Sequence, residues 1–246
     1  MKVAVFGGTG RIGSRVVALL DAAGHEAVPH GLSTGVDLVS GRGVAGAVRG
    51  ADVAVNLTNS PTFDEASPAF FRASMDTLLT AARDADVSHA VVLSIVGADR
   101  VPDVVHYRAK VLQEDLLKEG PVPYSIVRAT QFFEFVDTVL SWTADADTVR
   151  LPTTPLQPVA AADVARVVAD VSAGPPLTGT VEVAGPEVYP LDELGRITLA
   201  AHGDGRTVVT DPTAGLYAAV PDDAITAGED ALIATTTYRD WLAATG

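Results

Sequence analysis

A glycine loop directly after the first apolar run constrains the fold more than any other feature of the sequence. Residues 3–6 form a short apolar run, which is typical of a strand buried on both faces of a parallel sheet. The spacing Gly7-x-x-Gly10-x-x-Gly13 follows, and residues 12–23 have the apolar spacing of a helix. Glycine lets the backbone turn sharply and approach a pyrophosphate, while the helix start supplies N–H groups for phosphate oxygens. The loop in this context predicts a nucleotide-binding site.

Strand-like and helix-like runs alternate through the first half of the chain. We predict strands over 3–6, 26–29, 51–57, 89–94 and 124–128, and helices over 12–23, 44–49, 69–85 and 105–118. This alternation predicts right-handed crossovers and a doubly wound parallel sheet with helices on both faces, which is a Rossmann-type α/β fold.

The alternation of strand-like and helix-like runs becomes less regular after about residue 130. There we predict helices over 132–142, 162–173 and 191–201, and a strand over 180–184. We therefore predict a single domain that spans 1–246. Its Rossmann core would occupy 1–130, and 131–246 would be mainly a substrate lobe, with the strand near 180–184 returning to the sheet.

Composition excludes several classes of protein. The chain has 246 residues, of which 48% are hydrophobic, as in an ordinary globular domain. It has no cysteine, which excludes disulfides and thiolate chemistry, and its histidines lack metal-ligand spacing, so no metal site is predicted. The net charge of −14 disfavours a nucleic-acid partner. No run of about 18 apolar residues and no signal peptide is present, so we expect a cytoplasmic protein without a membrane partner.

The glycine loop also indicates which residues would contact a dinucleotide. Within the loop these are Gly7, Thr9, Gly10, Arg11, Ile12 and Gly13. Further contacts are expected from Asp37 and Leu38 toward the adenine, and from Asn56, Leu57 and Thr58 at the end of the third strand.

The residue after the second strand normally distinguishes NAD from NADP. An acid there favours NAD and a basic residue favours NADP, but this strand ends in Pro29-His30-Gly31. Without an acid to repel a 2′-phosphate, and with Arg11 in the loop, the sequence favours NADP. We expect His30 itself to be a surface loop residue.

Several motifs together resemble the short-chain dehydrogenase/reductase superfamily, in its atypical, NmrA-like branch. They are GGTGRIG (7–13), GVDLV (35–39), VVLSIVG (91–97), YRAKVLQE (107–114), PYSIVRATQFFEF (123–135), QPVAAADVA (157–165) and VEVAGPEVYPLDEL (181–194). The resemblance implies a Rossmann core, bound NAD(P) and a smaller C-terminal substrate lobe. Many members of the superfamily are oxidoreductases, while some bind NADP as sensors without turnover.

The residues that this superfamily normally uses for catalysis are partly present. The resemblance implies a serine that orients the substrate oxygen, and a Tyr-x-x-x-Lys motif whose tyrosine exchanges a proton with that oxygen. The lysine binds the nicotinamide ribose and lowers the tyrosine pKa. Ser94 and Lys110 match the serine and the lysine, but His106 stands at the tyrosine position and Tyr107 is shifted by one residue.

On a helix both rings neighbour Lys110, about 100° apart around the axis, so one of them can take the tyrosine's place. Three interpretations stay open: Tyr107 serves after a local shift, His106 substitutes, or proton transfer is lost and the protein binds a cofactor without turnover.

The sequence thus favours an NAD(P)-dependent oxidoreductase for a small, largely apolar carbonyl, enone or quinone. Phe132, Phe133 and Phe135 are candidates for an apolar pocket wall. One alternative is an NAD(P)H-binding redox sensor without turnover. Another is a non-redox isomerase, dehydratase or cyclase on the same scaffold. The expected partners are a small-molecule substrate and a second copy of the chain in a homodimer.

Overall fold

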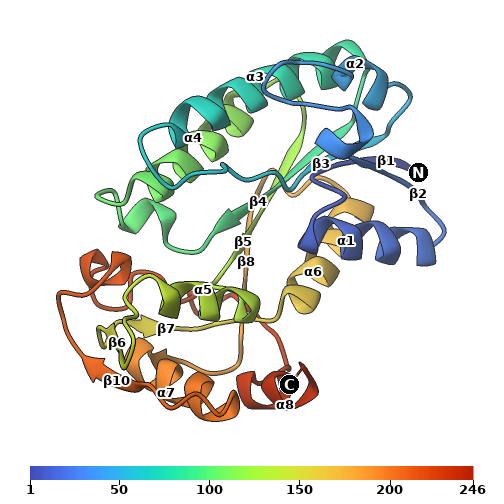
Figure 1. Cartoon of the computed structure of the whole chain (residues 1–246). Coiled ribbons are helices and arrows are strands. Elements are labelled where there is room, and N and C mark those ends of the chain that lie inside the picture. Colours follow the sequence, from blue (N-terminus) through green and yellow to red (C-terminus); the bar gives the residue numbers. More distant parts are fainter. Residues whose placement is uncertain (246) are drawn as a thin grey trace. The chain divides into compact units, whose positions relative to one another are not determined.

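The computed structural model describes residues 1–245 (Figure 1). The chain divides into two compact units. Unit 1 contains Met1–Ser94, Val105–Arg128 and Val164–Val181, and unit 2 contains Ile95–Val104, Ala129–Asp163 and the residues from Glu182 onward. Two segments therefore depart from a division at residue 130, since 95–104 cluster with unit 2 and 164–181 with unit 1. That the two units serve cofactor and substrate stays a prediction.

A seven-stranded parallel sheet is the centre of the fold, with the strand order β11-β8-β5-β4-β3-β1-β2. The strands are β1 (Lys2–Phe6), β2 (Glu26–His30), β3 (Val53–Asn56), β4 (His89–Ile95), β5 (Tyr124–Ala129), β8 (Gly179–Ala184) and β11 (Leu232–Ile233). The order reverses at β1, which pairs with β2 on one side and with β3 on the other. In doubly wound sheets, ligands bind at such a reversal, outside the carboxyl ends of the strands.

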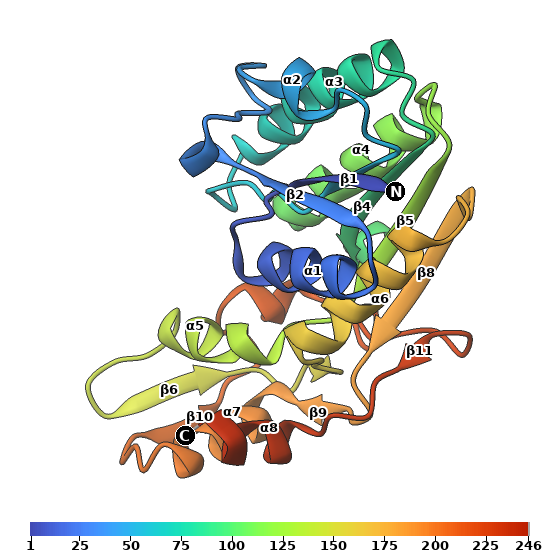
Figure 2. The ribbon, with the colours of Figure 1, turned by 90° about the vertical axis from the view of Figure 1, so that its right-hand side faces the viewer.

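Helices cover both faces of this sheet, as Figures 1 and 2 show from two directions. On one face lie α1 (Arg11–Ala22) and α6 (Ala161–Ala173), and on the other lie α2 (Val44–Ala47), α3 (Ser67–Asp84) and α4 (Val105–Glu119). The layer of α2, α3 and α4 packs against the sheet through a hydrophobic core that includes Phe6, Met75, Leu78, Leu117 and Ile126. Coverage on both faces explains why the strands read as continuous apolar runs. The predicted doubly wound Rossmann-type fold is confirmed.

Unit 2 contains shorter elements. Strands β6 (Thr148–Leu151) and β10 (Thr207–Thr210) pair in parallel, and β7 (Pro155–Leu156) pairs with β9 (Tyr189–Pro190) in antiparallel. The helices are α5 (Val136–Ser141), α7 (Leu191–Ala201) and α8 (Tyr238–Thr245). Within residues 1–245, no helix combines the length and apolar character that crossing a membrane requires.

The predicted helix over 132–142 is wrong in its first half. Phe132 is extended and bridges to Val159: Val159 N–H donates to Gln131 O at 2.8 Å and Phe133 N–H donates to Val159 O at 3.0 Å. These bonds use backbone groups that a helix would need, so a short 3₁₀ turn over Phe133–Phe135 precedes α5.

Charge is divided unevenly between the units. Unit 1 holds 13 acidic and 12 basic residues, whereas unit 2 holds 18 acidic and 5 basic residues. The acidity of the chain is therefore a property of unit 2.

Candidate cofactor-binding and active site

The glycine loop is a tight turn between β1 and α1. Gly7 has a φ of +77°, and its N–H donates to the carbonyl of His30 at 2.9 Å. A Cβ on Gly7 would lie 2.9 Å from the carbonyl carbon of Leu57, and one on Gly13 would lie 2.1 Å from the carbonyl oxygen of Gly7. Both positions lack room for a side chain, so the loop needs glycine for close backbone packing.

The start of α1 presents donors to solvent. Gly10 is the N-cap, and no side chain in the described chain caps this end. The first-turn N–H groups therefore have no partner within the helix, and they carry the positive end of its dipole. Thr9, Gly10 and Arg11 are exposed, and no acidic residue stands in the first turn. This arrangement suits an anion such as a pyrophosphate.

We expect Gly13→Ala to lower the free energy of unfolding by about 1–3 kcal/mol, since the new methyl group meets backbone that has nowhere to move. Urea unfolding measures this change. Gly46→Ala is the matched control, because Gly46 lies in α2 and a Cβ there meets nothing within 4 Å. Equal stability of the two variants would contradict the tight loop.

The end of β3 lies beside the loop at the reversal of strand order. Asn56 is fully buried, and its Oδ1 accepts hydrogen bonds from Thr58 N–H at 3.0 Å and from Thr58 Oγ1 at 2.7 Å. Its side chain therefore shapes the backbone that follows. Leu57 and Thr58 are half-buried next to Gly7, where a cofactor would pass.

The residues expected near the adenosine have varied surroundings. His30 is half-buried, which corrects the expected surface position, because its ring packs 5.5 Å from that of Phe6. Burial and then the charge of Lys2 lower its pKa, so the imidazole is neutral at neutral pH. Asp37 accepts from Val39 N–H and Ser40 Oγ within its own turn. The Leu38 side chain lies in the core, which leaves its backbone for any cofactor contact.

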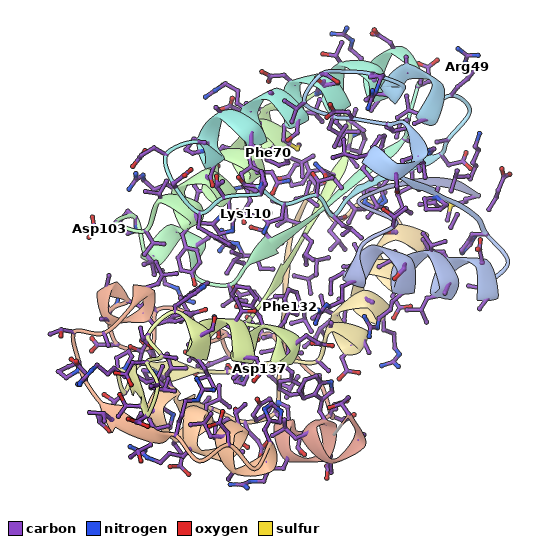
Figure 3. The ribbon with its side chains drawn as sticks, in the orientation of Figure 1. Arg49, Phe70, Asp103, Lys110, Phe132 and Asp137 are labelled. Atoms are coloured by element: carbon purple, nitrogen blue, oxygen red, sulfur yellow. The ribbon has the colours of Figure 1, made fainter. Side chains whose placement is uncertain are left out.

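Lys110 lies on α4 and is buried (Figure 3). Its Nζ donates to Leu93 O at 2.7 Å and to Gln113 Oε1, and it stands 4.7 Å from the centre of the Phe71 ring. Two N–H groups of the amine are thus engaged in hydrogen bonds within the protein. Burial lowers the pKa of Lys110 to about 7, against the opposing effect of the Glu114 charge.

His106 lies one helical turn before Lys110 on α4, and the lysine charge affects the pKa of its imidazole. Its imidazole lies edge-on to Phe63 at 4.6 Å and 6.1 Å from Phe71, and burial followed by the Lys110 charge lowers its pKa to about 4. Nδ1 is buried and has no hydrogen-bond partner among the described residues. Tyr107 is also buried. The structure thus brings His106 beside Lys110, as a neutral imidazole at neutral pH.

A buried ion pair lies one turn further along α4. Glu114 is fully buried and accepts from Arg128 Nε at 2.9 Å and Nη2 at 2.7 Å. Burial raises the pKa of this carboxyl, but the Arg128 hydrogen bonds, the nearby Ser94 hydroxyl and the charges of Arg128 and Lys118 outweigh burial and lower it. Ser94 is buried, and within residues 1–245 its Oγ has no partner at normal hydrogen-bond geometry.

Sequence reasoning missed four members of this region: Phe63, Phe71, Gln113 and Glu114. Gln113 and Glu114 stand three and four residues after Lys110, so helical spacing alone places them near the lysine. The two phenylalanines come from the segment before α3 and from α3 itself, and no spacing rule links them to α4.

The three candidates for an apolar wall lie in unit 2 and differ in role. Phe133 is buried against Tyr238 and Trp241, so it is a core residue. Phe132 and Phe135 are half-buried. In the part of the chain that the structure describes, no group of three metal-ligating side chains occurs.

Solved structures with the same fold are known, although no family model and no curated protein sequence matches the chain. A short-chain dehydrogenase/reductase superfamily protein from Agrobacterium tumefaciens with bound NAD has a TM-score of 0.67 and 17% identity, with 86% of this chain and 85% of that chain covered. The fold is that of the short-chain dehydrogenases/reductases.

Two further structures share this short-chain dehydrogenase/reductase fold. The NADPH-dependent quinone oxidoreductase from Escherichia coli, complexed with NADPH, has a TM-score of 0.72 and 17% identity over 99% of both chains. The dTDP-4-dehydrorhamnose reductase from Bacillus anthracis in complex with NADP has a TM-score of 0.70 and 16% identity, with 85% of this chain and 84% of that chain covered. The resemblance inferred from the sequence motifs is thereby confirmed at the level of the fold.

Proposed function

We propose that the chain is an NmrA-like, NAD(P)H-dependent oxidoreductase that prefers NADPH and reduces a small apolar acceptor. The observation that carries the proposal is the glycine loop at the reversal of strand order, with an uncapped helix start behind it. The backbone of Gly7–Gly13 would hold the pyrophosphate. The absence of an acid at the end of β2 and the exposed Arg11 support the preference for a 2′-phosphate.

The chain's own residues favour a quinone among carbonyl, enone and quinone acceptors. When bound, a reduced nicotinamide supplies a hydride. A ketone that gains a hydride becomes a strongly basic alkoxide and needs a nearby acid. His106 is neutral, and its Nδ1 has no hydrogen-bonded route to a proton within the described residues. The Nζ of Lys110 donates to Leu93 O and Gln113.

A quinone does not need such an acid. After gaining a hydride it leaves as a phenolate, whose conjugate acid has a pKa of about 10. This anion is a much weaker base than an alkoxide, so it is stable until it takes up a proton from the surrounding water. Neither His106 nor Lys110 would then have to supply the proton.

A cofactor-binding sensor without turnover is the second candidate. It is favoured by Lys110, whose amine is buried and donates hydrogen bonds to Leu93 and Gln113 inside the protein. A lysine held in this way is turned to the protein interior, away from a nicotinamide ribose.

Cofactor binding and turnover separate the two candidates. We expect titration calorimetry to show tighter binding of NADPH than of NADH. We expect NADPH absorbance to fall with tetramethyl-1,4-benzoquinone, and more slowly with 2-cyclohexenone or 2-heptanone. Binding without consumption of NADPH would favour the sensor, and binding of neither dinucleotide would refute both candidates. Gly46→Ala should bind as the parent protein does, whereas Gly13→Ala should not bind.

A further inference from the structure

Phe63 is an exposed aromatic residue placed over the candidate active site. It belongs to the segment between β3 and α3, and 45% of its surface is exposed. Its ring lies edge-on to the His106 imidazole, with 4.6 Å between the ring centres. The ring therefore offers apolar surface to solvent directly beside a buried imidazole, since His106 is 4% exposed.

The segment that carries Phe63 is held in place. Thr62 Oγ1 donates to Asp64 Oδ1 at 2.8 Å, and Ser67 Oγ donates to Thr62 O at 2.6 Å. Glu65 also lies 3.5 Å from the Arg108 guanidinium on α4. These interactions hold the backbone of the segment on both sides of Phe63.

Phe71 and Lys110 also lie near His106 within unit 1. The Phe71 ring is 6.1 Å from the imidazole and is itself fully buried, and the Lys110 ammonium lies over that same ring. Of the three aromatic rings in this group, Phe63 is the exposed one, whereas His106 and Phe71 are buried.

We propose that Phe63 is the residue that contacts the acceptor and selects planar, aromatic or quinonoid rings over aliphatic ones. Its exposed face would stack on such a ring, while its edge covers His106. This inference rests on the proposed function, since it names the residue that gives the same site its preference among acceptors.

The test measures binding without turnover, so that it does not depend on catalysis. Tetramethyl-1,4-benzoquinone is titrated into the full chain with NADP⁺, and the His106 ring resonances are followed by nuclear magnetic resonance. We expect Phe63→Ala to weaken quinone binding about tenfold, the size of one lost aromatic contact. Phe63→Tyr should restore it, and NADP⁺ affinity should not change.

Phe70→Ala is the matched control, since it removes an equal ring one residue before Phe71 on α3 (Figure 3). It should leave quinone binding unchanged, and 2-cyclohexenone should bind Phe63→Ala and the parent protein alike. A second readout is the imidazole pKa, which should rise from about 4 in Phe63→Ala as water reaches His106, with Lys110 still beside it.

Three results would overturn the inference: quinone binding that is unchanged in Phe63→Ala, an equal loss in Phe70→Ala, or no response of His106 to quinone in the parent protein. Quinone binding that depends on Phe63 without NADPH consumption would support the inference and refute the proposed oxidoreductase. NADPH turnover that does not depend on Phe63 would support the proposed oxidoreductase and refute the inference.

Discussion

Replacing Glu114 by glutamine is expected to lower the free energy of unfolding by about 3–5 kcal/mol, the usual effect of removing one partner of a buried ion pair. Glu114 is fully buried, and the side chain of Arg128 is 13% exposed. The amide of glutamine keeps the shape but removes the charge, so the Arg128 guanidinium loses the carboxylate to which its Nε and Nη2 donate. Urea unfolding at neutral pH measures the loss.

A neighbouring residue supplies the control for Glu114. Asp115 pairs with Lys118 at 3.2 Å but is half exposed, so Asp115→Asn should change stability by less than about 0.5 kcal/mol. The double variant Glu114→Leu/Arg128→Met should recover most of the stability, because it leaves no charge to solvate. A loss in Glu114→Gln no larger than in Asp115→Asn would show that the pair is not a structural element.

Lys110→Met is expected to abolish any NADPH turnover. Methionine removes the cost of burying an amine, but it also removes the hydrogen bonds to Leu93 O and Gln113 Oε1, so its two effects on the free energy of unfolding oppose each other. Lys118→Met is the control, because the Lys118 side chain is 39% exposed and its replacement should change little.

The pH dependence of stability tests the same lysine. Its pKa in the folded chain is about 7, below the ordinary 10.5, so between these values the unfolded chain binds more protons. Stability should therefore rise with pH above 7, by about 1.4 kcal/mol per pH unit at most. Urea unfolding at pH 7, 8 and 9 should show this rise in the parent protein and a flatter profile in Lys110→Met. Equal slopes would contradict the burial of a neutral amine.

The first half of the fold follows from the sequence because its strands are continuous apolar runs and its main helices, α1, α3 and α4, have 12, 18 and 15 residues. The predicted helix over 105–118 is α4 with one further residue, for example. Unit 2 is different because its strands have two to four residues and pair across long stretches of chain. Thr148 of β6 faces Thr207 of β10, and neither short run has a period of its own.

The candidate site was predictable in its positions but not in its side-chain directions. Helical spacing places His106 and Lys110 side by side. It does not show that the Lys110 amine turns to Leu93 on β4 and to Phe71 on α3, because those neighbours come from other elements. No pattern in the sequence predicts the contact of Phe63 with His106, since that contact depends on the folded position of its loop.

The uneven charge of the two units links folding to the ions in solution. Unit 2 has 18 acidic and 5 basic residues, and bringing them into a compact body raises the density of negative charge. A denser negative body gathers more cations around it than an open chain does. We therefore expect the cations that gather around the folded protein to concentrate on unit 2, whereas unit 1, with 13 acidic and 12 basic residues, should attract few of them.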